Sequence, residues 1–243
     1  MIPYFVLTLS ALLGGLSLLV FGLFLVLGPL EIVPLGLSLK AALVWDAGLC
    51  LAFFAQHSAM IRRRFRDRLG RWLPAHLQPA LYSIASGTLL LLLVALWQRT
   101  PLVLLSVEGA PRWALRALVV AAAVVFLWAI RSLGSFDTFG LAPIRAHLRG
   151  TTPRNLPLAI RGPYRWVRHP LYGLFIVMAW TFPEVTADRL LFNVLFTAWI
   201  VLGTVLEERD LVRELGDSYR TYQTQVPMLV PWRWPSPPRN GGM

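Results

Sequence analysis

Long uncharged apolar stretches alternate with short polar segments along most of this chain. The first stretch, Tyr4–Leu30, contains no charged residue and exceeds the roughly 20 residues that an α-helix needs to cross a bilayer. Stretches of this kind predict an all-α integral membrane protein with about six transmembrane helices. The predicted spans are Tyr4–Leu30, Ala41–Ile61, Ala80–Trp97, Trp113–Ile130, Leu171–Phe182 and Leu190–Leu206.

The last two predicted spans form a hydrophobic hairpin that is interrupted at Pro183-Glu184. Span Leu171–Phe182 is short for a hydrocarbon core of about 30 Å, so we expect it to tilt, to extend into the preceding segment or to stop partway. Two polar blocks flank the hairpin, RGPYRWVRHPLY at Arg161–Tyr172 and EERDLVRELGDSYRTYQTQVP at Glu207–Pro227. Because the two ends of a hairpin lie on the same membrane surface, the blocks are predicted to form one cap.

Composition supports the membrane assignment. The chain has 243 residues, of which 56% are hydrophobic and 14% charged, and its mean hydropathy is +0.60. A cleaved signal peptide is disfavoured, because the first apolar run is too long and lacks a basic segment before it. The lone Cys50 excludes an intrachain disulfide.

The net charge of +11 comes almost entirely from arginine, and the arginines cluster in two loops. By the positive-inside rule, loops rich in basic residues face the cytoplasm. The rule predicts that both termini and the cap are cytoplasmic, in an inner or plasma membrane. Nucleic-acid binding is disfavoured because no basic region is large enough to form a separate domain, and anionic lipid headgroups are a better secondary partner. The clustered residues are Arg62, Arg63, Arg64, Arg66, Arg68 and Arg71, then Arg145, Arg149, Arg154, Arg161, Arg165 and Arg168.

The chain is predicted to be a single membrane domain. Residues 1–131 form a scaffold of four membrane helices, residues 132–231 a cofactor-binding catalytic region, and residues 232–243 a disordered tail rich in proline and glycine. Prolines at positions 143, 153, 157 and 163 argue against one continuous helix before the hairpin.

The first polar block combines basic and aromatic residues. Gly162-Pro163 is typical of a turn, and Pro170 suits the first turn of a helix. Arg168 and His169 are therefore predicted to lie at the mouth of the fifth span. An interfacial aromatic belt with snorkelling arginines is the alternative interpretation. The nearby aromatic residues are Tyr164, Trp166 and Tyr172.

The second block places acidic residues where a plain membrane helix would not. Glu207 and Glu208 follow an apolar span directly, although negative charge is unfavourable at a helix C-terminus and attracts no anionic lipid. We expect their helix to end at Gly216. The next turn is predicted to be capped by Asp217 and Ser218 and to carry Tyr219 and Tyr222 on one face.

Together the blocks suit a small zwitterionic ligand that bears an adenosine. Arginine suits a carboxylate, the acids suit an ammonium group or ribose hydroxyls, and aromatic faces suit adenine or a sulfonium. In the alternative interpretation, the acids are solvated helix charges that Arg209 and Arg213 satisfy.

The motifs of this region occur together in one known group of enzymes. The order RHPLY, hydrophobic hairpin, EERDL, G-x-x-Y-x-x-Y and VP resembles the isoprenylcysteine carboxyl methyltransferase superfamily of integral membrane methyltransferases. Within it, the chain is most similar to the methanethiol S-methyltransferases, over nearly its whole length. Further matching segments are Gln56–Met60 with Arg62 and Phe65, Phe136-Asp137, Phe139–Leu141 and Val226–Leu229.

The resemblance implies S-adenosylmethionine bound under a cytoplasmic cap without a Rossmann domain, and no G-x-G-x-x-G occurs in the chain. It implies no metal. One departure concerns Gly134 and Ser135, which stand where the methanethiol enzymes carry Asn-His, so the identity of the acceptor stays open. The cofactor-binding residues it implies are Tyr164, Arg168, His169, Pro170, Tyr172, Glu207, Glu208, Tyr219 and Tyr222.

A base would help by generating a thiolate, and His57 near the cytoplasmic end of the second span is the candidate. Its alternative is a histidine that packs between helices. Asp46 and Cys50 fall on the same helix face, and Asp46 more simply lies at the outer interface. Asp137 is a second candidate catalytic residue, with helix capping as its alternative. The candidate acceptor-binding residues are Gln56, Ser58 and Arg62.

The predicted function is methylation of a small thiol, most simply methanethiol to dimethyl sulfide. Alternative acceptors are lipid-like, such as a prenylcysteine carboxylate or a phospholipid amine. Membrane sterol reductases share part of the C-terminal pattern, but the adjacent acids and the small size argue against them. A non-enzymatic membrane protein of the nitrogen-oxide-respiration type is the remaining alternative.

Overall fold

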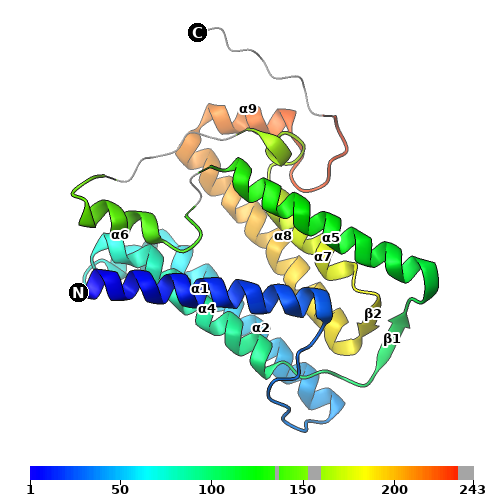
Figure 1. Cartoon of the computed structure of the whole chain (residues 1–243). Coiled ribbons are helices and arrows are strands. Elements are labelled where there is room, and N and C mark those ends of the chain that lie inside the picture. Colours follow the sequence, from blue (N-terminus) through cyan, green and yellow to red (C-terminus); the bar gives the residue numbers. More distant parts are fainter. Residues whose placement is uncertain (135–136, 153–159, 235–243) are drawn as a thin grey trace. The chain divides into compact units, whose positions relative to one another are not determined.

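The structure is a computed structural model that describes residues 1–134, 137–152 and 160–234. It is almost entirely helical (Figure 1). The helices are α1 (Ile2–Leu27), α2 (Leu39–Ile61), α3 (Arg63–Leu69), η1 (Ala75–Leu77), α4 (Gln78–Leu96), α5 (Gly109–Ser132), α6 (Leu141–Leu148), η2 (Gly162–Arg165), α7 (Pro170–Trp180), α8 (Ala187–Leu215) and α9 (Asp217–Gln225).

Within the described ranges, five helical segments are long and apolar enough to cross a membrane: α1, α2, η1 with α4, α5 and α8. These confirm an integral all-α membrane protein. The fifth predicted span, Leu171–Phe182, is a helix of only 11 residues, α7 (Pro170–Trp180). At 1.5 Å per residue it extends about 16 Å, roughly half of a hydrocarbon core, so it does not cross the membrane by itself.

The sequence patterns did not predict the two short strands, β1 (Val103–Ser106) and β2 (Glu184–Thr186). They pair antiparallel, with Val103 opposite Thr186 and Ser106 opposite Glu184. The break at Pro183-Glu184 is therefore a strand rather than a simple turn. Pairing of this kind depends on segments about 80 residues apart, which periodicity does not reveal.

The chain divides into two compact units, and α5 and α8 each contribute to both. Unit 1 comprises Met1–Arg112, Asp137–Asn155 and Phe182–Phe196. Unit 2 comprises Trp113–Phe136, Leu156–Thr181 and Thr197–Met243.

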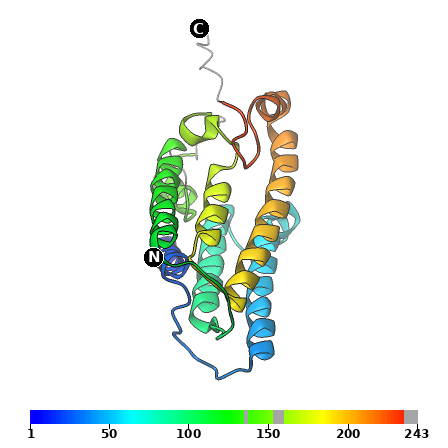
Figure 2. The ribbon, with the colours of Figure 1, turned by 90° about the vertical axis from the view of Figure 1, so that its right-hand side faces the viewer.

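In unit 1, α1 packs closely on α4, and α4 packs on α2 (Figures 1 and 2). Small buried residues allow this approach: a Cβ on Gly87 would lie only 3.0 Å from the carbonyl oxygen of Leu13. Farther along, Phe24 packs edge-on against Trp97 and Phe192, with ring centroids 5.6 and 5.1 Å apart. These contacts form the apolar core of the unit.

Buried polar groups tie the ends of the unit 1 helices together. Asp188 accepts hydrogen bonds from the indole N–H of Trp97 at 3.1 Å and the backbone N–H of Thr100 at 2.9 Å. Asp46 accepts one from the backbone N–H of Gln98 at 3.0 Å. Through this contact the Asp46 carboxylate holds the segment that follows α4, while its placement at the outer interface stays a prediction.

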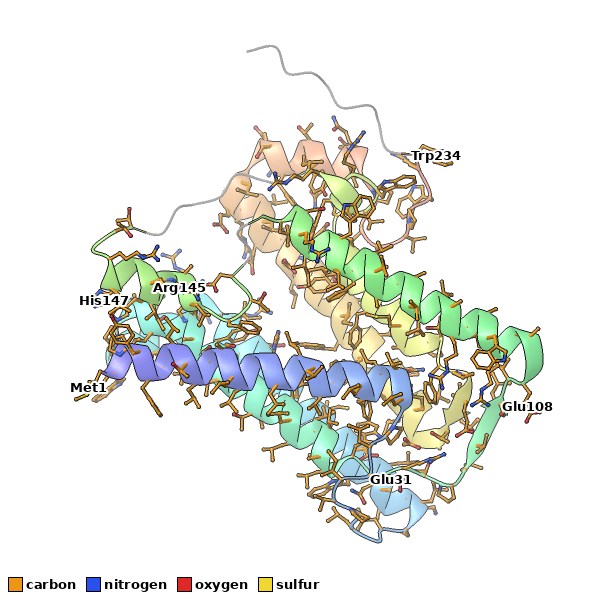
Figure 3. The ribbon with its side chains drawn as sticks, viewed as in Figure 1. Met1, Glu31, Glu108, Arg145, His147 and Trp234 are labelled. Atoms are coloured by element: carbon orange, nitrogen blue, oxygen red, sulfur yellow. The ribbon has the colours of Figure 1, made fainter. Side chains whose placement is uncertain are left out.

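Helix α6 packs on α1 near its N-terminal end, where Arg145 and His147 lie close to Met1 (Figure 3). The imidazole of His147 stacks on that of His76 in η1, with centroids 3.8 Å apart. Charged loops at the opposite end of the unit are joined by Arg99, whose guanidinium contacts Glu31 at 3.4 Å and Glu184 at 3.1 Å.

In unit 2, α7 and α8 contact each other at both ends. The indole N–H of Trp180 donates to the hydroxyl of Thr197 at 2.9 Å, and the Tyr172 hydroxyl donates to Glu207 at 2.8 Å. Helix α8 ends where predicted, because Gly216 adopts a positive φ of 60°. The predicted cap by Asp217 and Ser218 is wrong, since α9 has no side-chain cap and the Ser218 hydroxyl donates backward to the Leu215 carbonyl.

Candidate active site

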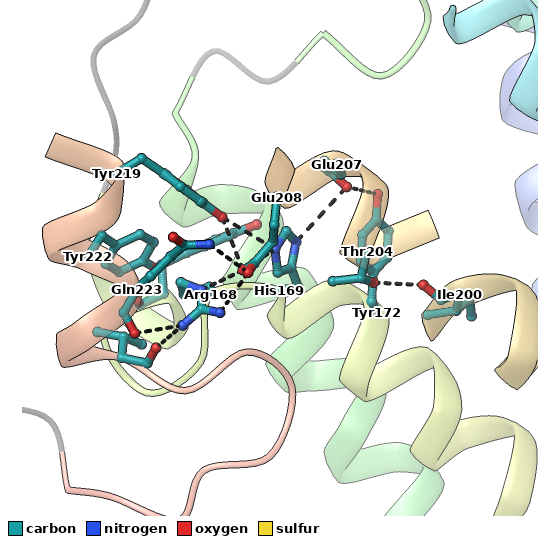
Figure 4. Close-up of polar contacts among 12 residues, drawn as sticks. Arg168, His169, Tyr172, Ile200, Thr204, Glu207, Glu208, Tyr219, Tyr222 and Gln223 are labelled. Atoms are coloured by element: carbon teal, nitrogen blue, oxygen red, sulfur yellow. Dashed lines mark hydrogen bonds and ion pairs between the residues drawn. The ribbon is translucent and has the colours of Figure 1, made fainter. Parts of the chain in front are cut away.

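The cap of unit 2 is assembled from the start of α7, the end of α8, helix α9 and the segment after it (Figure 4). Pro170 is the first residue of α7, as predicted, which leaves the two preceding backbone N–H groups outside the helix. The N–H of Arg168 donates to the Pro227 carbonyl at 2.8 Å and that of His169 to the Met228 carbonyl at 3.1 Å. The two polar blocks are thus joined through their backbones.

Arg168 and Glu208 form the centre of the cap. The guanidinium Nε lies 2.5 Å from Oε1 and Nη2 lies 2.8 Å from Oε2, which is a two-pronged ion pair. The third nitrogen, Nη1, donates to the backbone carbonyls of Gln223 and Val226. The two side chains are only 8% and 11% exposed. Each nitrogen of Arg168 therefore already has a protein partner.

Three further donors converge on the Glu208 carboxylate. The Gln223 amide donates to Oε2 at 2.9 Å, and the Tyr219 hydroxyl donates to Oε1 at 3.2 Å. The His169 Nε2 atom lies 3.2 Å from Oε1. A buried carboxylate with this many donors is well satisfied, so Glu208 holds the cap together.

Glu207 has a different environment from its neighbour. Its side chain is 43% exposed, and it accepts a hydrogen bond from the Tyr172 hydroxyl. The Tyr172 ring stacks parallel to the His169 imidazole, with centroids 5.5 Å apart and an angle of 4° between the planes. An accessible carboxylate beside two parallel rings is suited to a cationic ligand.

Burial sets the protonation states around these acids. It lowers the pKa of His169, and the charge of Arg168 acts in the same direction, against the opposing charges of Glu207 and Glu208. The imidazole is therefore neutral at physiological pH. Burial and then the charge of Glu207 raise the pKa of Tyr164 to about 12, so its hydroxyl stays protonated.

Tyr219 and Tyr222 lie on one face of α9, as predicted, and both are buried. Their rings meet edge-on at 5.8 Å, and the Tyr222 hydroxyl donates to the backbone carbonyl of Tyr164 at 2.5 Å. Burial raises the pKa of each hydroxyl. In this arrangement Tyr222 positions the first block through its backbone.

Comparison with known proteins places the chain among enzymes. It is 37% identical over 199 residues to the methanethiol S-methyltransferase of Pseudomonas sp. (strain GM41(2012)), covering 82% of this chain and 76% of the relative. It is 35% identical over 200 residues to that of Mycobacterium tuberculosis (strain ATCC 25618 / H37Rv), covering 82% and 80%. The chain belongs to the methanethiol S-methyltransferase family. Membership implies a methyl donor.

Similarity extends to proteins with other names. Nurim from Bos taurus is 29% identical over 186 residues, covering 72% of this chain and 70% of nurim. No protein-family model matches the chain, and no solved structure matches it. The assignment to the methanethiol S-methyltransferase family thus comes from its individual relatives.

The residues predicted for the acceptor of this family member lie in unit 1. His57 is half-buried on α2, and the Tyr82 hydroxyl lies 2.7 Å from its Nε2 and 3.0 Å from its Nδ1. The Gln56 amide donates to the Ser86 hydroxyl at 3.3 Å. Ser58 is half-buried on the same helix, and Arg62 is exposed where α2 ends. Their catalytic and substrate roles remain predictions.

Asp137 lies before α6, and its carboxylate accepts two backbone N–H groups of that helix. Oδ1 accepts from Leu141 at 2.9 Å and Oδ2 from Ala142 at 2.8 Å. These bonds satisfy two of the N–H groups that a helix start leaves without partners. The capping alternative is thus present in the structure, while a catalytic role remains a prediction.

Gly134 and Ser135 stand where the sequence differs from the expected Asn-His pair. Ser135 lies outside the described residues, as does Phe136. Gly134 has a φ of 75°, and a Cβ there would lie 2.8 Å from the Arg161 guanidinium. A larger residue at this position would therefore displace Arg161, whose Nε donates to the Ser132 carbonyl at 2.7 Å.

Two contributing residues were missed by the sequence patterns. Gln223 follows Tyr219 by four positions, a helical spacing that places both on the face directed to Glu208. Tyr82 is the partner of His57, but it lies 25 residues away on α4 and no local pattern links the two. The first could have been found from helical spacing, the second only from the fold.

Proposed function

We propose that this chain is an S-adenosylmethionine-dependent methyltransferase that methylates a small thiol, most simply methanethiol to dimethyl sulfide. The names of its relatives, which are methanethiol S-methyltransferases at 35–37% identity, support this substrate. The accessible Glu207 carboxylate beside the stacked rings of His169 and Tyr172 is the structural observation that carries the proposal.

The residues of the cap fit this cofactor chemically. Glu207 has its charge available for the ammonium or sulfonium group, and the aromatic faces suit a sulfonium or an adenine. Arg168 is already occupied by Glu208 and two carbonyls, so we propose that it positions the cap instead of taking the carboxylate of the cofactor.

When bound, S-adenosylmethionine would supply a methyl group whose bond to the sulfonium sulfur breaks, with the electron pair returning to that sulfur. In our proposal His57 accepts the proton of the thiol, and Gln56, Ser58 and Arg62 bind the acceptor. Exclusion of water favours the reaction because oppositely charged reactants yield neutral products. The cap and both termini are proposed to face the cytoplasm, from the placement of the arginines.

The test is binding and turnover of the purified protein in detergent. Calorimetry with S-adenosylmethionine should show binding, and gas chromatography should detect dimethyl sulfide when methanethiol is added. Glu207→Gln should weaken cofactor binding about tenfold, the size expected for a charge-assisted hydrogen bond. Glu214→Gln, which removes an exposed acid from the same helix, should leave binding unchanged.

The results separate the alternatives. Cofactor binding without product from any thiol, but with methylation of a prenylcysteine or a phospholipid amine, would move the proposal to a lipid-like acceptor. Absence of cofactor binding by the wild-type protein would overturn the methyltransferase assignment of this chain.

A further inference from the structure

A cleft of about 410 Å³ lies beside Glu208, within unit 2. It is lined by Val205, Glu208, Arg209, Val212, Arg213 and Gln223, so its walls come from α8 and α9. Figure 4 shows Glu208 and Gln223 at the junction of these helices. Its volume lies in the range of small-ligand sites.

The cleft carries excess positive charge. Arg209 and Arg213 are one helical turn apart and both are exposed. The guanidinium of Arg209 has no hydrogen bond or ion pair with any residue that the structure describes. Arg213 contacts Asp210 at 3.1 Å, an exposed pair of the kind that contributes little stability. The charge of Glu208 is already offset by Arg168, so the cleft favours an anion.

One wall of the cleft continues into an exposed apolar surface. Val205 and Val212 line the cleft, and Val201 and Leu202 lie one turn earlier on the same side of α8. Leu202 is 66% exposed although its helix is long and apolar enough to cross a membrane. A ligand that fits both features has an anionic head and an apolar tail.

We propose that this cleft binds the headgroup of an anionic phospholipid. The phosphate contacts Arg209 and Arg213, and the acyl chains lie on Val201, Leu202 and Val205. A free phosphate would use the arginines but leave the apolar wall unoccupied, so the lipid is the better match to the whole surface. The proposal does not depend on methyl transfer.

Native mass spectrometry of the detergent-purified protein tests the site. Phosphatidylglycerol should form one adduct that is much tighter than any formed by phosphatidylcholine. The double variant Arg209→Gln/Arg213→Gln should weaken that adduct about thirtyfold, the factor expected for two basic residues near an anionic surface. Because both arginines are exposed, the melting temperature should not change.

A charge-matched control is Arg63→Gln/Arg64→Gln on α3, which removes two exposed arginines elsewhere and should retain the tight adduct. Equal loss in this control would show general electrostatic attraction and overturn the proposal, as would an unchanged adduct in the cleft variant. Displacement of the lipid by millimolar inorganic phosphate or by S-adenosylmethionine would assign the cleft to a soluble anion or to the cofactor, and would also overturn it.

Discussion

Glu207 and Glu208 are adjacent in the chain but have different environments, because successive residues of a helix point about 100° apart. Glu208 is directed to Arg168, Gln223 and Tyr219 and is almost fully buried. Glu207 is directed to Tyr172 and stays accessible. The sequence predicted both in one cofactor site without separating the accessible carboxylate of Glu207 from the buried carboxylate of Glu208 that holds the cap together.

Replacing Glu208 by alanine should therefore destabilise the fold and not only weaken ligand binding. The change leaves the Arg168 guanidinium buried without its counter-charge, which typically costs about 3–5 kcal/mol. Thermal unfolding in detergent measures the effect. Asp210→Ala, an exposed acid on the same helix, should cost less than about 1 kcal/mol. Equal melting temperatures for the two variants would contradict the organising role of Glu208.

At the scale of elements, α6 shows how a short helix is held in unit 1. Asp137 caps its first turn, and the Ser10 hydroxyl of α1 donates to the Phe139 carbonyl just before it at 2.6 Å. Gly140 has a φ of 68° and lies against the backbone of Pro79 and Ala80. The prolines predicted that no single helix continues through this segment. The tightly packed turn at Gly140 is one place where the helix is interrupted.

Gly140→Ala should be much more costly than Gly150→Ala. Both glycines have positive φ, 68° and 66°, so an added Cβ costs about 1 kcal/mol of backbone strain at either site. At Gly140 the Cβ would also overlap the backbone of Pro79, whereas at Gly150 it meets nothing within 4 Å. Thermal unfolding should show a loss of about 3 kcal/mol for the first variant. Similar losses at the two sites would exclude the steric explanation.

At the scale of the whole molecule, the candidate base and the residues of the cap belong to different compact units. His57 belongs to unit 1, and Glu207 with the rest of the cap belongs to unit 2. Each unit is built from three separate segments of the chain, so neither unit is a continuous stretch of sequence.

If His57 accepts the thiol proton, His57→Ala should lower turnover most at low pH, where free thiolate is scarce. The expected loss is about a hundredfold below the pKa of the thiol and much smaller above it. A pH–rate profile with methanethiol measures it, and His76→Ala serves as a control histidine in the same unit. A loss of equal size at every pH would indicate a structural role for His57.

The sequence by itself determined the membrane class, five of the six predicted spans, the end of α8 at Gly216, the start of α7 at Pro170 and the residues of the cap apart from Gln223. These follow from apolar length, glycine and proline conformation and motif order, all of which are local properties. Tertiary structure decided the pairing of β1 with β2, the partner of His57 and the different environments of Glu207 and Glu208. Each of these depends on contacts between residues 25 to 80 or more positions apart, which local patterns do not encode.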